Sequence, residues 1–166
     1  MLQVALVACV FSLLVPAHAA KDSKTARELI ETALEELRAL EKAAYGLDGW
    51  LTQIAANLDS SRFDVSQSSS YRDMRRAADG LSTVGTQVQA LASKCAQDQK
   101  KAGSEFRALT RRLQSSVRSV SNATSVSFAQ MGTSRVTQDA AEVRQALGSL
   151  SEIDRCEELA EEKKDE

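Results

Sequence analysis

Apolar residues recur at alternating steps of three and four along most of this chain, a spacing typical of amphipathic helices. The clearest run reads Met74, Ala77, Leu81, Val84, Val88, Leu91 and Cys95. No segment alternates apolar and polar residues cleanly at a period of two, and 4% of the residues are aromatic, so strands are not favoured. The spacing therefore predicts an all-α protein.

Three further apolar stripes have the same period. They lie at residues 26–58, 106–120 and 136–153. Thr25 and Glu28 are spaced as a capping box at the start of the first stripe. We predict one domain at residues 20–166, an antiparallel bundle of three to four long amphipathic helices. The stripe at 74–95 would also suit an intermolecular coiled-coil seam, which makes a homo-oligomer a further hypothesis.

Glycine and clustered polar residues predict the breaks between helices. We expect a kink or break at 46–49, a mobile serine-rich loop at 59–70, a turn at 97–104 that contains Gly103, and a break at 132–134. Residues 115–127 are rich in serine, threonine and valine, which lower helix propensity, so fraying or an irregular turn is expected there.

Residues 1–19 have the layout of a cleaved secretory signal. An apolar block at 4–16 leads to the small-residue site Ala17-His18-Ala19. That block is shorter than the roughly 20 residues of a membrane-spanning helix, so we expect a secreted, extracellular protein without a membrane span. The alternative is a lipoprotein signal that ends at Cys9, but no basic residue and too short an apolar stretch precede this cysteine.

Once the signal is removed, the chain contains neither histidine nor proline. Ser-His-Asp and Cys-His sites both require an imidazole group. No glycine-rich phosphate loop is present, residues 59–66 lack the ligand spacing of a calcium loop, and no four residues form a plausible zinc set. We therefore expect a non-enzymatic protein with no cofactor and no metal.

Two cysteines remain after the cut, Cys95 and Cys156. In an oxidising compartment two such thiols usually pair, although two buried free thiols are the alternative. A disulfide would close a loop of about 60 residues, for which chain entropy gives roughly 4 kcal/mol of stabilisation. Asn122-Ala123-Thr124 is an acceptor for N-glycosylation, and Asn122 is expected to be exposed, opposite the apolar stripe. Both features agree with export.

The cysteine pair also constrains the topology. Cys95 is expected on the apolar seam of the second helix and Cys156 near the end of the fourth, with a charged tail following at 157–166. In a square bundle these two helices are diagonal, about 14 Å apart, whereas the Cα atoms of a disulfide lie roughly 4.4 to 6.8 Å apart. Either the bundle tapers, or helices two to four form a three-helix core with the first laid against it. We favour the second arrangement.

Charge is unevenly distributed along a chain of net charge −2. Residues 71–118 carry ten Lys and Arg against four Asp and Glu, whereas residues 135–166 carry five against ten. The expected members of a basic binding face are Lys100, Lys101, Arg107, Arg111, Arg112 and Arg118. The competing interpretation is a solvated surface whose charges pair between helices. Nucleic acid is not expected as a ligand, because the protein is acidic and aromatic residues are not interleaved with the basic ones.

Two classes of function fit these features. The first is a secreted binding protein for a macromolecular partner, either an extracellular protein or an anionic glycan; a host-directed or salivary-type product is one setting for such a protein. The second is an extracellular carrier that holds lipid or another apolar ligand between its amphipathic helices. Trp50, the single tryptophan, is either a core residue or an anchor for a ligand or partner.

Overall fold

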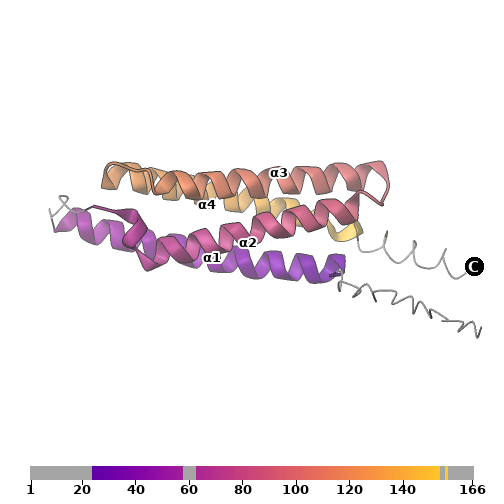
Figure 1. The fold of residues 1–166 in the computed structure, drawn as a ribbon, viewed down its shortest axis with the longest axis horizontal. Helices are drawn as coiled ribbons and strands as arrows, with labels where there is room; N and C mark the ends of the chain where they lie inside the picture. The colour runs from indigo at the N-terminus through magenta and orange to yellow at the C-terminus, as the bar shows by residue number, and fades with distance from the viewer. Residues whose placement is uncertain (1–23, 58–62, 154–155, 157–166) are drawn as a thin grey trace, which may run out of the picture.

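The computed structural model describes residues 24–57, 63–153 and 156. The signal expected at 1–19 and the charged tail expected at 157–166 lie outside these residues. Four long helices make up nearly all of the described chain and run antiparallel in sequence order (Figure 1). They are α1 (Ala26–Ala56), α2 (Ser69–Ala92), α3 (Gln97–Val120) and α4 (Val126–Gly148), with a short 3-10 helix, η2 (Val65–Gln67), before α2. The predicted all-α helical bundle is confirmed.

Each helix packs against two neighbours. α2 lies between α1 and α3, and α4 lies between α3 and α1, so α2 and α4 are diagonal in a square bundle. The three-helix core that we favoured from the sequence is therefore wrong. Its premise also fails, because Cys95 lies in the turn that follows α2 and not on the helix itself.

α1 begins with the predicted capping box. Glu28 donates its backbone N–H to Thr25 Oγ1 at 3.3 Å, and Thr25 donates its own N–H to Glu28 Oε2 at 2.9 Å. The break expected at 46–49 is absent, because α1 is a single helix of 31 residues that includes both Gly46 and Gly49. The burial of Leu47 and Leu51 explains why the helix continues. The free energy gained by burying these two side chains exceeds the loss of helix stability that the two glycines cause.

The expected turn at 97–104 is also placed wrongly. The chain turns at 93–96, and α3 already includes Gly103. A Cβ atom at Gly103 would lie 2.6 Å from the Cβ of Ala92 and 3.4 Å from the Cα of Gln89. Gly103 is thus a contact residue that lets α3 approach α2 closely, and it does not end a helix.

The break expected at 132–134 is likewise wrong, because these residues lie inside α4. A Cβ atom at Gly132 would lie 3.0 Å from a methyl carbon of Val120, so this glycine permits close contact between α4 and the end of α3. The irregular turn expected within 115–127 is present at 121–125. Ser125 ends it by accepting the backbone N–H of Phe128 on its hydroxyl, as an N-cap.

The serine-rich stretch at 59–70 is partly ordered secondary structure. Its described part contains η2, whose Val65 is buried, and α2 begins at Ser69. Asp64 caps η2 by accepting hydrogen bonds from the backbone N–H and the hydroxyl of Ser66, at 2.9 and 2.7 Å, and these bonds lower the pKa of the Asp64 carboxyl. Side-chain capping and one buried valine therefore order a segment that its composition presents as a loop.

Candidate functional surface

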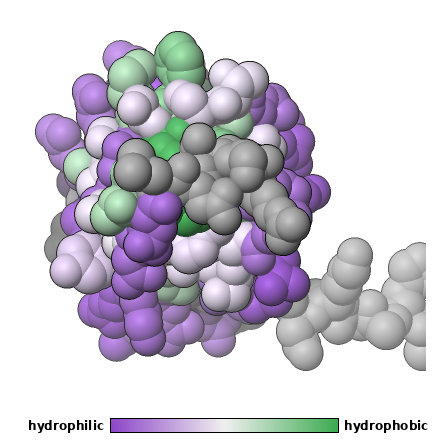
Figure 2. Space-filling model, turned by 90° about the vertical axis from the view of Figure 1, so that its left-hand side faces the viewer, coloured by the Kyte–Doolittle hydropathy of each residue, from purple (hydrophilic) through white to green (hydrophobic). Residues whose placement is uncertain are grey.

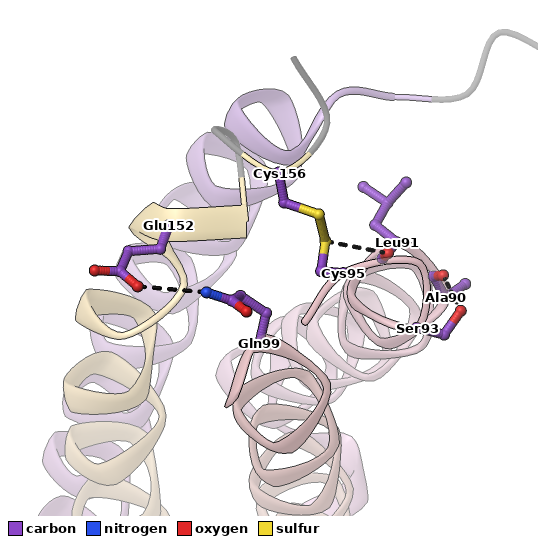
Figure 3. Close-up of a disulfide and its surroundings, with 7 residues drawn as sticks. All are labelled: Ala90, Leu91, Ser93, Cys95, Gln99, Glu152 and Cys156. Atoms are coloured by element: carbon purple, nitrogen blue, oxygen red, sulfur yellow. Dashed lines mark hydrogen bonds between the residues drawn. A yellow bond between two sulfur atoms is a disulfide. The ribbon is translucent and has the colours of Figure 1, made fainter. Parts of the chain in front are cut away.

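The disulfide closes one end of the bundle (Figure 3). Cys95 and Cys156 are bonded, as predicted, with their Cα atoms 5.8 Å apart. The turn at 93–96 carries Cys95 away from α2 toward α3, so the bond is made beyond the helix ends and the diagonal separation does not oppose it. Beside it Gln99 Nε2 donates to Glu152 Oε2 at 3.4 Å. This end is therefore held covalently.

The six basic residues lie along two sides of α3. At 100° per residue, Lys100, Arg107, Arg111 and Arg118 follow one line of the helix, while Lys101 and Arg112 are turned about 100–120° away. Arg107 donates to Gln89 of α2, and Arg118 Nη2 lies 3.5 Å from Asp79 of α2. Lys101 is 3.9 Å from Glu105 on its own helix.

Arg112 is held on the other side, by α4. Its Nε is 3.0 Å from Asp139 Oδ1, and it also donates to Glu142, a bond that raises the pKa of the guanidinium above its ordinary value. Ser116 donates to Asp139 Oδ2 at 2.6 Å. Intramolecular pairing between helices thus occupies several of the basic residues, as the competing interpretation of the charge pattern predicts.

The polar cluster around Asp139 was not predicted from the sequence. Asp139 is buried, with 5% of its surface exposed, although it lies between the buried Val136 and Ala140. The available signal was its position: an aspartate next to Ala140 on the apolar stripe needs a partner across the interface.

Asn122 is exposed in the turn between α3 and α4. Sequence spacing placed it on the outer face of a helix; the structure places it beyond the end of α3, where it is equally accessible. Trp50 is partly buried and packs on the core, and its ring lies 6.4 Å from that of Phe63 in a stacked arrangement. Trp50 therefore has a packing role in the bundle.

An apolar patch lies at the end of the bundle opposite the disulfide. Phe128 and Met131 of α4 are 60% and 62% exposed, and the partly buried Ala123 and Val126 lie close to them in sequence. Figure 2 views this end and shows apolar side chains gathered at its upper edge, over the region where α3 and α4 meet. The patch was not predicted from the sequence, because the fourth apolar stripe begins at Val136.

A second feature is a groove between α1 and α2, with about 480 Å³ of space. Its lining consists of small residues and charged residues. It is lined by Glu36, Ala39, Lys42, Ala43, Gly46, Ser70, Asp73, Arg76 and Ala77. Asp73 and Arg76 are 3.4 Å apart and form an exposed ion pair on the α2 side.

Within residues 24–57, 63–153 and 156, no group of three or more His, Cys, Asp or Glu side chains is placed to hold a metal ion. None of the helices in this part of the chain combines the length and the apolar character needed to cross a bilayer. Comparison with protein-family models, with curated proteins and with solved structures gives no match. The site must therefore be interpreted from its own chemistry.

Proposed function

We propose that this chain is an exported, non-enzymatic helical protein that binds an extracellular protein partner through the apolar patch formed by Phe128 and Met131. The observation that carries the proposal is the exposure of these two side chains, one helical turn apart on α4. Phenylalanine and methionine are enriched in protein interfaces, and methionine adapts readily to a partner's shape. Exposed in water, both represent apolar surface that a partner would bury.

A protein partner is better supported than an anionic glycan. A glycan would need several free cations on one face, but Arg107, Arg112 and Arg118 already contact neighbouring helices. Lys100 and Arg111 remain exposed, and two cations provide little of the charge that such a polyanion requires.

The alternative function, an apolar carrier, requires helices to separate. The Gly103–Ala92 approach leaves no side-chain layer between α2 and α3 at that point. The apolar gap near the disulfide, lined by residues of α1, α2 and 150–153, has essentially no room for a water molecule. These contacts favour a closed scaffold over a carrier.

Export is part of the same proposal. It rests on the layout of residues 1–19, on the Cys95–Cys156 disulfide, which is typical of oxidising compartments, and on the exposure of Asn122. We propose that a glycan on Asn122 borders the apolar patch at this end of the bundle. Mass spectrometry of protein from its own source should find an N-terminus at Ala20 and a glycosylated Asn122.

Capture from the extracellular fluid of the source tests the binding function. The mature, oxidised protein should retain a protein that the Phe128→Ser/Met131→Ser variant loses, with roughly tenfold weaker binding of the purified partner. Tyr45→Ser is the matched control, because Tyr45 is 85% exposed but lies on α1.

Three outcomes would contradict the proposal. The first is a partner that binds the double serine variant as well as it binds the native protein. The second is capture that heparin displaces and Arg111→Ala abolishes, which would indicate a glycan. The third is a co-purified lipid in native mass spectrometry, which would indicate a carrier.

A further inference from the structure

Arg135 continues the face of α4 on which Phe128 and Met131 are exposed. At 100° per residue the three side chains fall within an arc of about 60°, over two turns of the helix. Arg135 is exposed, and in the described part of the chain it makes no hydrogen bond and no ion pair. One turn beyond Met131, the apolar patch is therefore followed by a guanidinium group that pairs with no described carboxylate.

Within α4, the residues that border Phe128 and Met131 carry no negative charge. Side chains three and four positions apart are neighbours on a helix. For these two side chains the other neighbours in α4 are Ser127, Gly132, Ser134 and Arg135. The first carboxylate of α4 belongs to Asp139, and it is already bound by Ser116 and Arg112 of α3. Arg135 is therefore the one charge that borders the patch on its own helix.

The helices that flank α4 supply no carboxylate at this end of the bundle. Figure 1 shows that α1 and α3 both end at the pole where α4 begins. Residues 49–57 of α1 contain no charged side chain, and residues 106–120 of α3 contain four arginines and neither aspartate nor glutamate. In the described parts of these three helices, the surroundings of the patch are thus neutral to positive.

The remaining large apolar side chain that is exposed among the described residues has a different border. Tyr45 of α1 is 85% exposed, and the residues three and four positions away from it include Glu41, Lys42 and Asp48. Both signs of charge therefore surround Tyr45. A single sign borders the patch on α4, and this difference gives the patch a preference among partners that Tyr45 lacks.

We propose that the protein partner offers an apolar pocket bordered by carboxylates, and that Arg135 selects this partner by pairing with one of them. This inference rests on the proposed function, because it describes what the patch binds. Phe128 and Met131 supply the apolar contact, and aromatic, methionine and arginine side chains are the types enriched at protein interfaces. A guanidinium group donates two parallel hydrogen bonds to a carboxylate, so Arg135 adds specificity as well as attraction.

A second copy of this chain and an anionic membrane fit less well. The same surface of a second copy brings no carboxylate to Arg135. The apolar stripe at 74–95, predicted as an alternative seam for self-association, is mostly buried inside the bundle. Basic segments that bind anionic membranes have roughly four to eight Lys or Arg residues, whereas this face of α4 has one beside the patch.

Selection from a phage-displayed library of random peptides tests the chemistry that the patch recognises. The bait is the mature, oxidised protein, and peptides that also bind the Phe128→Ser/Met131→Ser variant are removed. We expect the remaining peptides to combine apolar residues with an excess of Asp and Glu over Lys and Arg. The same selection on Arg135→Glu should lose this excess. Arg111→Glu, a reversal of an exposed cation on α3, is the matched control and should keep it.

The affinity of one selected acidic peptide gives the size of the effect. Fluorescence anisotropy should show that Arg135→Glu raises the dissociation constant roughly tenfold and that Arg111→Glu leaves it unchanged. Arg135→Lys should have a smaller effect, because lysine keeps the charge but loses the paired hydrogen bonds. Raising the salt concentration should weaken binding to the native protein. Circular dichroism establishes that each variant is folded, and every substituted side chain is exposed.

The outcomes separate this inference from the proposed function. Patch-dependent peptides without an acidic excess, or an acidic peptide that binds Arg135→Glu as tightly as the native protein, would overturn the inference and leave the proposed function standing. If no selected peptide depends on Phe128 and Met131, both fail. Binding to vesicles of phosphatidylcholine and phosphatidylserine, or a dimer in sedimentation velocity, would also overturn the inference if the double serine variant loses it, because the patch would then serve a membrane or a second copy.

Discussion

The contact between α2 and α3 and the contact between α3 and α4 hold the same helix by different means. Against α2, α3 uses small residues: Gly103 meets Ala92, and Gly85 lies where a Cβ atom would be 2.3 Å from Thr110 Oγ1. Against α4, Ser116 and the partly exposed Arg112 of α3 hold the buried Asp139. Polar side chains also join α2 to α3, and Gly132 also lies in the α3–α4 contact. Among the described residues, however, the buried charged side chain belongs to the α3–α4 contact.

This difference shows how a bundle with few aromatic residues obtains a defined arrangement. Close backbone approach brings many dispersion contacts that are individually weak. A buried aspartate that needs both a hydroxyl and a guanidinium tolerates very little sliding, because misalignment leaves it without partners. The polar contact therefore favours one register of α4 on α3, and the small-residue contact allows α2 and α3 to approach closely.

The largest change in stability should come from removing the disulfide, which lies at the end of the bundle where α2 ends and α3 begins. Cys95→Ser/Cys156→Ser should lower the free energy of unfolding by roughly 4 kcal/mol, because the unfolded chain loses a cross-link across 61 residues. Urea denaturation, monitored by circular dichroism, measures this change. If the variant unfolds with unchanged stability, the two contacts hold the bundle without covalent help.

Breaking the polar contact is expected to have the next largest effect. Asp139→Ala should destabilise the protein by about 2–3 kcal/mol, because Ser116 loses its acceptor and Arg112 loses one of its two carboxylates. Asp139→Asn keeps an acceptor oxygen and should cost less. The same urea titration distinguishes the two variants. If both lower the free energy of unfolding equally, the carboxylate has no hydrogen-bonding role.

The small-residue contact can be tested with one substitution at two sites. Gly103→Ala should destabilise the protein by about 1–2 kcal/mol, because the new methyl would overlap Ala92. Gly49→Ala should instead stabilise it by up to about 1 kcal/mol, since nothing lies within 4 Å and alanine favours the helix. Thermal unfolding of both variants measures these two changes in stability. A gain in stability at Gly103 would mean that α2 and α3 are not in close contact there.

The smallest effect concerns Glu36, which belongs to neither contact and serves as a reference. Burial raises the pKa of this carboxyl in the folded state. Its contribution to stability is therefore fully present below the ordinary carboxyl pKa and is lost as the pH rises through the raised folded value. Glu36→Gln should match the native protein at low pH and be slightly more stable at neutral pH.

The measurement is the free energy of unfolding as a function of pH. Glu31→Gln, an exposed position on the same helix, should show no such pH-dependent gain. If Glu36→Gln is less stable than the native protein at neutral pH, then the Glu36 carboxylate has a stabilising partner in the folded protein.

Local and covalent features of this protein follow from its sequence alone. The three-and-four spacing predicts four helical stripes, because one apolar face per helix must be buried. Thr25 and Glu28 predict the start of α1, since a capping box needs only neighbours three residues apart. The pairing of Cys95 with Cys156 was predicted from the two cysteines that remain after the expected signal, and the structure contains this disulfide.

Only the tertiary structure decides what each glycine does and where each charge points. Gly46, Gly103 and Gly132 were all predicted to interrupt helices, yet all three lie within them. Glycine weakens a helix by about 1 kcal/mol, and the dispersion contacts made by close approach to another helix can offset that loss. The sequence does not reveal which element lies opposite a residue. For the same physical reason, the partners of Arg112, the exposure of Phe128 and the partial burial of Glu36 emerge only when the helices are packed together.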